Sequence, residues 1–169
     1  MLSEILCAAV IAIGMPNADR ACEYMDLVVE VSQQRDIQPE ALVALIHVES
    51  RWNPNAISRA NACGLTQVIP KWTGGRATGK VKYTCEQLLV PETSIRAGGQ
   101  IFSWWLHSYG RCREGRCRRS HYTIGLCGYN AGFRCRGDTP NQTGMRYARA
   151  VLRKARQIQR AAERIRTQN

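Results

Sequence analysis

Apolar residues recur every three or four positions along most of the chain, which is the spacing of amphipathic helices. This pattern predicts helices over residues 22–34, 39–51 and 91–109. Pro39 suits the first turn of the second helix, where a missing N–H costs nothing. Pro54 should stop that helix, because the residue before a proline avoids helical geometry.

Two more helices are predicted towards the C-terminus. The first covers "HYTIGLCGYNAG" and stops at Gly132, and the second begins near Thr143. The second carries an apolar face, made by Tyr147, Val151, Ala155, Ile158, Ala162 and Ile165, and arginines fill its other face. Residues 55–90 and the basic, cysteine-flanked residues 110–120 predict loops. Strand-like alternation is scarce, so we expect a mainly α fold in a single compact domain with little β structure.

The N-terminal segment, residues 1–21, allows three interpretations. Residues 5–15 are apolar, yet no Lys or Arg precedes them and Pro16 weakens a signal-peptide cleavage site. The segment could be an extra helix that caps the domain, a cleaved secretory signal or a releasable membrane tether. We therefore divide the chain into this segment, a main domain over 22–153 and a basic helical extension over 154–169.

The charge pattern predicts a polyanionic partner. The chain carries a net charge of +11, and residues 146–169 hold eight Lys or Arg against one Glu. Nucleic acid, anionic lipid and the acidic polymers of a bacterial cell wall all fit such a charge. No recognised nucleic-acid motif accompanies it, so we expect no nucleic-acid partner.

Eight cysteines are more than a chain of this size needs in a reducing compartment. They favour an oxidising environment and disulfides, although eight thiols allow about a hundred pairings and the sequence selects none. A zinc site made of Cys112, Cys117, Cys127 and Cys135 is conceivable. The gaps between these cysteines do not match the tight knuckles of structural zinc sites, so we expect no metal and no cofactor.

Glu49 is the residue that most suggests chemistry. Within "ALVALIHVES" it follows Leu42, Leu45 and Ile46 by seven, four and three positions, so it lies on their apolar side of the helix. Burial disfavours a carboxylate, and the negative end of the helix acts in the same direction. We therefore expect Glu49 to stay protonated near neutral pH and to be able to donate a proton, as cleavage of a glycosidic bond requires.

Four stretches in order, "ALVALIHVES", "NPNAISRANACGLTQ", "LLVPETSIRAGGQIFSWWLHSYG" and "GYNAG", resemble the motifs of the soluble lytic transglycosylase family. The resemblance covers about residues 22–153. It implies a lysozyme-like, mostly helical fold and cleavage of the MurNAc–GlcNAc β-1,4 bond of peptidoglycan. It also implies action in the bacterial cell envelope, whether periplasmic, secreted or phage-delivered, by a monomer.

The resemblance assigns roles to six residues. Glu49 matches the family's catalytic acid and base, and Ser50 matches the serine after it. Five positions match residues that shape the glycan site: Ser50, Gln67, Tyr129, Asn130 and Tyr147. The hydroxyl of Tyr147 is expected to meet Glu49. Thr66 departs from the family pattern, which has methionine before the glutamine.

The family mechanism needs one acid, whereas most glycosidases use two carboxylates. No second candidate stands out, because Asp36, Glu40, Glu86, Glu92 and Asp138 all lie outside the matched motifs. Glu49 would protonate the glycosidic oxygen and then accept the proton of the MurNAc 6-hydroxyl, which leaves a 1,6-anhydro end. The alternatives are a hydrolytic, goose-type muramidase and a non-enzymatic basic protein that binds nucleic acid or membrane.

Other residues are expected to serve the structure more than the chemistry. His47 lies on a different helix face from Glu49 and is expected to be structural. Trp52 or Trp72 could stack on a sugar ring, although large aromatic side chains usually belong to the core. The C-terminal cations are candidates to hold the chain to peptidoglycan strands or other anionic envelope polymers.

Overall fold

The structure, a computed structural model, describes residues 1–109, 121–136 and 139–168. Its α-helices are α1 (Leu2–Ala12), α2 (Ala18–Glu23), α3 (Met25–Gln34), α4 (Pro39–Ser50), α5 (Cys85–Leu89), α6 (Pro91–Tyr109), α7 (His121–Ala131) and α8 (Gln142–Gln168). Short 3-10 turns cover Pro70–Trp72, Arg76–Thr78 and Gly132–Cys135. Within the described residues, extended pairing is limited to two isolated bridges that share Cys63. The predicted mainly α fold is confirmed.

The predicted helices are found, with one division. The helix expected over residues 22–34 is two helices, because Tyr24 leaves helical geometry (φ −104°, ψ 1°) between α2 and α3. The helix that begins at Pro39 ends at Ser50, one residue before the predicted end at Arg51. It ends there because Arg51 and then Trp52 adopt left-handed backbone conformations (φ 52° and 66°).

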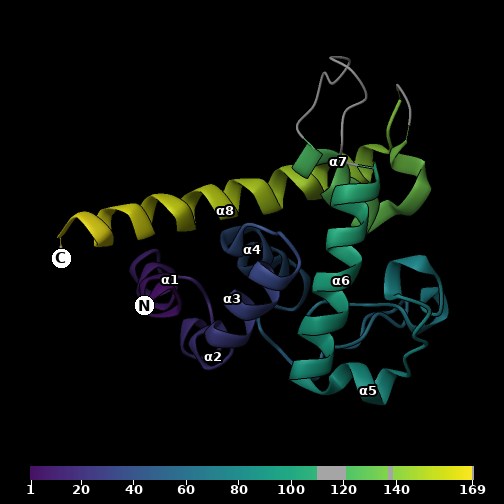
Figure 1. Ribbon diagram of the computed structural model, residues 1–169, viewed down its shortest axis with the longest axis horizontal. Coiled ribbons are helices and arrows are strands. Elements are labelled where there is room, and N and C mark those ends of the chain that lie inside the picture. The colour runs from purple at the N-terminus through teal and green to yellow at the C-terminus, as the bar shows by residue number, and fades with distance from the viewer. Residues whose placement is uncertain (110–120, 137–138, 169) are drawn as a thin grey trace.

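Helix α8 is the long element against which α1, α4 and α7 pack. It runs across the top of the molecule in Figure 1, with α1 and α4 beneath it and α7 at the end where it begins. Its apolar face matches the predicted stripe, since Val151, Ala155, Ile158 and Ala162 are buried. Burial of this face joins α1, α4, α7 and α8 in one hydrophobic core.

Helix α1 is part of that core. Leu6, Ala9 and Val10 are fully buried, and a disulfide between Cys7 and Cys22 ties α1 to α2. Among the described residues, no helix is both long enough and apolar enough to cross a bilayer.

Two adjacent glycines of α6, Gly98 and Gly99, lie close to side chains of other elements. A methyl group on Gly98 would collide with the Thr66 side chain, and one on Gly99 with Val31. The close approach to backbone occurs at Gly64 instead, where an added Cβ would lie 1.9 Å from the Leu88 carbonyl oxygen. Gly64 also has φ +76°, so both its backbone conformation and the lack of space for a Cβ require glycine at this position.

Three disulfides are present among the described residues: Cys7–Cys22, Cys63–Cys85 and Cys127–Cys135. The expectation of disulfides is confirmed. Cys127 and Cys135 are bonded to each other, so they cannot act as zinc thiolates. Cys112 and Cys117, like the loop predicted at 110–120, lie outside the described residues.

Candidate active site

Glu49 lies in the last turn of α4, one residue before the helix ends at Ser50. Leu42, Leu45 and Ile46 on the same side are fully buried, whereas the Glu49 side chain is partly buried. The 3.6-residue period therefore places the carboxyl group at the edge of the core, as the sequence predicted. The acid is held by a rigid helix.

Tyr147 of α8 reaches this carboxyl group. Its hydroxyl donates a hydrogen bond to Glu49 Oε1 over 2.6 Å, across 98 residues of sequence. Burial raises the pKa of Glu49 to about 7, and the Tyr147 hydrogen bond acts against that rise because it stabilises the anion. Glu49 is therefore partly protonated at neutral pH, which is the state a proton donor needs.

Tyr129 of α7 forms the second aromatic neighbour of Glu49. Its hydroxyl donates to the Thr66 carbonyl oxygen at 2.7 Å, which joins α7 to the loop before Gln67. Burial and the charge of Glu49 raise the pKa of both Tyr129 and Tyr147 well above the usual tyrosine value. Both phenols thus stay neutral hydrogen-bond donors.

Thr66, where the family pattern has methionine, is a buried structural residue. Its hydroxyl donates to the Ser94 carbonyl oxygen at 2.8 Å, and its N–H donates to Ser94 Oγ at 3.2 Å. Gly98 leaves room for this side chain. A threonine here therefore ties the loop to α6 by hydrogen bonds.

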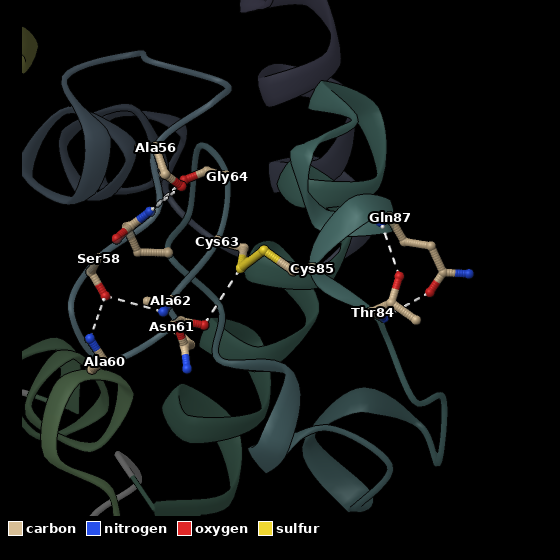
Figure 2. Close-up of a disulfide and its surroundings, with 11 residues drawn as sticks. Ala56, Ser58, Ala60, Asn61, Ala62, Cys63, Gly64, Thr84, Cys85 and Gln87 are labelled. Atoms are coloured by element: carbon tan, nitrogen blue, oxygen red, sulfur yellow. Dashed lines mark hydrogen bonds between the residues drawn. A yellow bond between two sulfur atoms is a disulfide. The ribbon is translucent and has the colours of Figure 1, made fainter.

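Gln67 closes the same loop. It has a left-handed backbone (φ 50°), and its side-chain nitrogen donates to the carbonyl oxygens of Ala56 and Gly64, each at 3.0 Å. Figure 2 shows the neighbouring residues of this loop, with the Cys63–Cys85 disulfide that fixes it to α5. Both N–H groups of the Gln67 amide are used inside the loop, so the side chain chiefly sets the loop's shape.

Ser50 and Asn130 lie at the ends of their helices. The Ser50 hydroxyl donates to the Ile46 carbonyl oxygen at 3.3 Å, within α4. Asn130 is exposed near the end of α7, one residue after Tyr129. Of the six predicted residues, Glu49 and Tyr147 are in direct contact, Tyr129 lies close to both, and Ser50, Gln67 and Asn130 flank them on three different elements.

The turn after Glu49 depends on residues that the sequence did not single out. The Arg51 carbonyl oxygen accepts a hydrogen bond from Asn17 at 2.8 Å, and the Trp52 carbonyl oxygen accepts one from Arg20 at 3.4 Å. The Trp52 side chain is fully buried, so the prediction that it could stack on a sugar is wrong. The N-terminal segment thus helps to hold the end of α4.

Trp72 has the opposite environment, with 72% of its surface exposed. It lines a cavity of about 590 Å³ beside the loop of Figure 2, together with Asn61, Lys71 and Glu86. The Lys71 ammonium lies 5.3 Å from the centre of the Trp72 ring. An exposed indole at a hollow is suited to stacking on a sugar ring.

Three of the other acidic candidates have environments that differ from that of Glu49. Glu92 pairs with Arg96 at 2.9 Å and Asp36 pairs with His107 at 3.7 Å. Glu86 is fully exposed in the first turn of α5, and its pKa is lowered by a hydrogen bond from its own backbone N–H and by one from Thr84. Asp138 lies outside the described residues. Among the acids that the structure describes, Glu49 is the one whose pKa is raised by burial, which suits proton donation.

Comparison with known protein families identifies most of the chain. The Transglycosylase SLT domain family matches residues 26–151. The chain is 36% identical over 95 residues to the membrane-bound lytic murein transglycosylase C of Photorhabdus laumondii, covering 53% of this chain and 26% of that protein. It is 32% identical over 119 residues to the protein of the same name from Yersinia pestis, and the match covers 67% of this chain and 32% of that protein.

Solved structures show the same fold. The 70 kDa soluble lytic transglycosylase of Escherichia coli superposes with a TM-score of 0.66 at 24% identity, covering 80% of this chain and 24% of that one. An inactive mutant of the Pseudomonas aeruginosa lytic transglycosylase gives a TM-score of 0.61 at 22% identity, covering 77% and 23%. The chain therefore spans about a quarter to a third of the length of the relatives described here.

Proposed function

The chain belongs to the Transglycosylase SLT domain family, and from this premise we propose that it cleaves the MurNAc–GlcNAc β-1,4 bond of peptidoglycan by lytic transglycosylation. The relatives that carry the domain are named lytic murein transglycosylases. The observation that carries the proposal is the Glu49 carboxyl group at the edge of the core. Its pKa is raised by burial, and it accepts a hydrogen bond from the Tyr147 hydroxyl.

In the first step Glu49 acts as the acid. It gives its proton to the glycosidic oxygen, because an alkoxide is a poor leaving group until it is protonated. The C1–O bond breaks as the acetamido group of the same MurNAc stabilises the positive charge that develops at C1. The Glu49 carboxylate that remains accepts the hydrogen bond from Tyr147, which stabilises the anion between the two steps.

In the second step Glu49 acts as the base. It removes the proton of the MurNAc 6-hydroxyl while that oxygen forms the new bond to C1. The acetamido group is released, Glu49 regains the proton it gave, and the sugar ends as a 1,6-anhydro ring. No water is consumed, so a single carboxyl group is sufficient.

The other predicted residues would bind the glycan around this centre. Tyr147 is a positioning residue for Glu49, and Tyr129 holds the loop before Gln67 in place. Asn130 is exposed and free to contact a sugar. Trp72 is the candidate for stacking on a sugar further along the strand.

Product analysis on purified peptidoglycan tests the proposal. Muropeptides released by the protein should be lighter by one water than the corresponding hydrolysis products, as measured by mass spectrometry. Products with ordinary reducing ends alone would show that water is the nucleophile, and the chain would then be a muramidase. Absence of any soluble product from intact sacculi would refute glycan cleavage itself.

A further inference from the structure

A basic cavity lies on the side of α4 away from Glu49. It has a volume of about 380 Å³ and is formed where the end of α4 meets α8. Its lining is His47, Val48, Arg51, Ala150, Arg153, Lys154 and Gln157. Three fixed cations and one imidazole thus surround a single hollow, and its lining in the described part of the chain includes no acid.

Among the described residues, the cations of this cavity have no acidic ion-pair partner. None of the ion pairs among the described residues includes Arg51, Arg153 or Lys154. Like charges held close together without compensation raise the local potential, and they are stabilised when an anion binds between them. These positive charges also act on the imidazole in the cavity. Burial lowers the pKa of His47, and the charges of Lys154 and Arg51 lower it further.

The cavity adjoins an arginine stripe on α8. Arg146, Arg149, Arg153, Arg156, Arg160 and Arg164 are all exposed and follow one another at intervals of three or four residues. This spacing keeps them on one side of the helix, opposite its buried face, over a length of about 27 Å. Arg153 belongs to both the stripe and the cavity, so a repeating polyanion on the stripe could place one of its charges in the cavity.

We propose that this cavity binds a phosphate group of an anionic envelope polymer or lipid. Paired guanidinium groups with an ammonium group match the several oxygens of a phosphate better than the two of a carboxylate. The remaining length of the stripe then takes the neighbouring charges of the same polymer or surface. Such a contact would hold the enzyme at the wall independently of the glycan site.

Titration with inorganic phosphate tests the cavity alone, by calorimetry and by the NMR signal of the His47 ring. Saturable binding of one phosphate is expected, with a rise in the pKa of His47 as the anion offsets Lys154 and Arg51. The double variant Arg153→Ala/Lys154→Ala should bind phosphate about tenfold more weakly for each cation removed. The Tm and circular dichroism of the variant should match those of the parent.

The variant Arg160→Ala/Arg164→Ala is the matched control. It removes two cations from the same helix and from exposed positions, but neither residue lines the cavity. It should leave phosphate binding unchanged. Equal weakening in both double variants, or no saturable binding, would show that α8 is only a solvated basic face and would overturn the proposal.

Two further probes identify the source of the phosphate. Binding of the protein to a soluble glycerol-phosphate oligomer and to phosphatidylglycerol vesicles is compared at one salt concentration. If the cavity variant Arg153→Ala/Lys154→Ala loses binding to one of these probes, the result supports the proposal and identifies that probe as the source of the phosphate. Tighter, cavity-dependent binding to double-stranded DNA of equal phosphate content would overturn the assignment to the envelope. Because every readout is binding, these results do not depend on whether Glu49 cleaves glycan.

Discussion

At the scale of single residues, the proposed chemistry depends on a carboxyl group that is costly to ionise where it lies. The core side of α4 withdraws Glu49 from water, and this burial raises its pKa to about 7. Tyr147 limits that rise by stabilising the anion. The pair can therefore give and take a proton near neutral pH.

Replacement of Glu49 by glutamine should abolish cleavage without unfolding the chain. Glutamine keeps the size of the side chain but has no proton to transfer, so the rate should fall about a hundredfold to ten-thousandfold. The release of soluble muropeptides from peptidoglycan measures this rate. Near-normal activity in a folded Glu49→Gln protein would contradict the assignment of the acid.

The same substitution should change how stability depends on pH. The folded-state pKa of about 7 lies above the ordinary value of 4.5, so the folded state binds the proton more tightly than the unfolded state. The free energy of unfolding should thus fall as pH rises from 4.5 through 7, by on the order of 3 kcal/mol. In Glu49→Gln this loss should be absent, which denaturant titrations at pH 4 and pH 8 would measure.

Tyr147→Phe should move the pH profile of activity. Loss of the phenol hydroxyl removes a bond that favours the carboxylate, so the pKa of Glu49 should rise further. The high-pH limb of the activity profile, where Glu49 loses its proton, should shift upward by about one pH unit, and the maximal rate should fall. The control is Tyr122→Phe, which removes a hydroxyl that accepts a hydrogen bond from the Gln38 N–H. This variant should leave the high-pH limb of the activity profile unchanged.

At the scale of elements, two disulfides stabilise different parts of the fold. Cys7–Cys22 ties α1 to α2, and Cys63–Cys85 ties the loop before Gln67 to α5. Their loops are of similar size, with sequence separations of 15 and 22 residues. They should therefore contribute similarly to stability but differently to the site.

Replacing each pair by serine tests that difference. Both double variants should lose about 3 kcal/mol of stability, measured by denaturant unfolding. Only Cys63→Ser/Cys85→Ser should also lower activity at a temperature where both are folded, because it releases the loop that Tyr129 and Gln67 hold. Equal activity in the two variants would mean that the loop is rigid without its disulfide.

At the scale of the whole molecule, α8 combines two tasks. Its inner face is buried against α1, α4 and α7, and Tyr147 on that side reaches Glu49. Its outer face carries the arginine stripe. Ile158, Ala161 and Ala162 are buried, so removal of residues 154–169 would expose the core, and charge substitutions are the cleaner test of the cations. The proposed boundary at residue 154 stays a prediction.

The sequence by itself determined most of the long helices and singled out Glu49 as the candidate acid. The periodic apolar positions predicted α4, α6, α7 and α8, because a helix repeats every 3.6 residues whatever it packs against. The same local geometry placed Glu49 on the apolar side of α4. The resemblance to the family then gave Tyr147 as its partner, which a sequence separation of 98 hides from any local pattern.

Only the tertiary structure decided the remaining features. The end of α4 is set by left-handed residues that Asn17, just before α2, and Arg20 of α2 hold by hydrogen bonds. Trp52 is buried because the chain turns into the core there. The basic cavity exists because α4 and α8 meet. Each of these features requires residues distant in sequence to come together, and the free energy that brings them together is burial of apolar surface, which no short segment possesses alone.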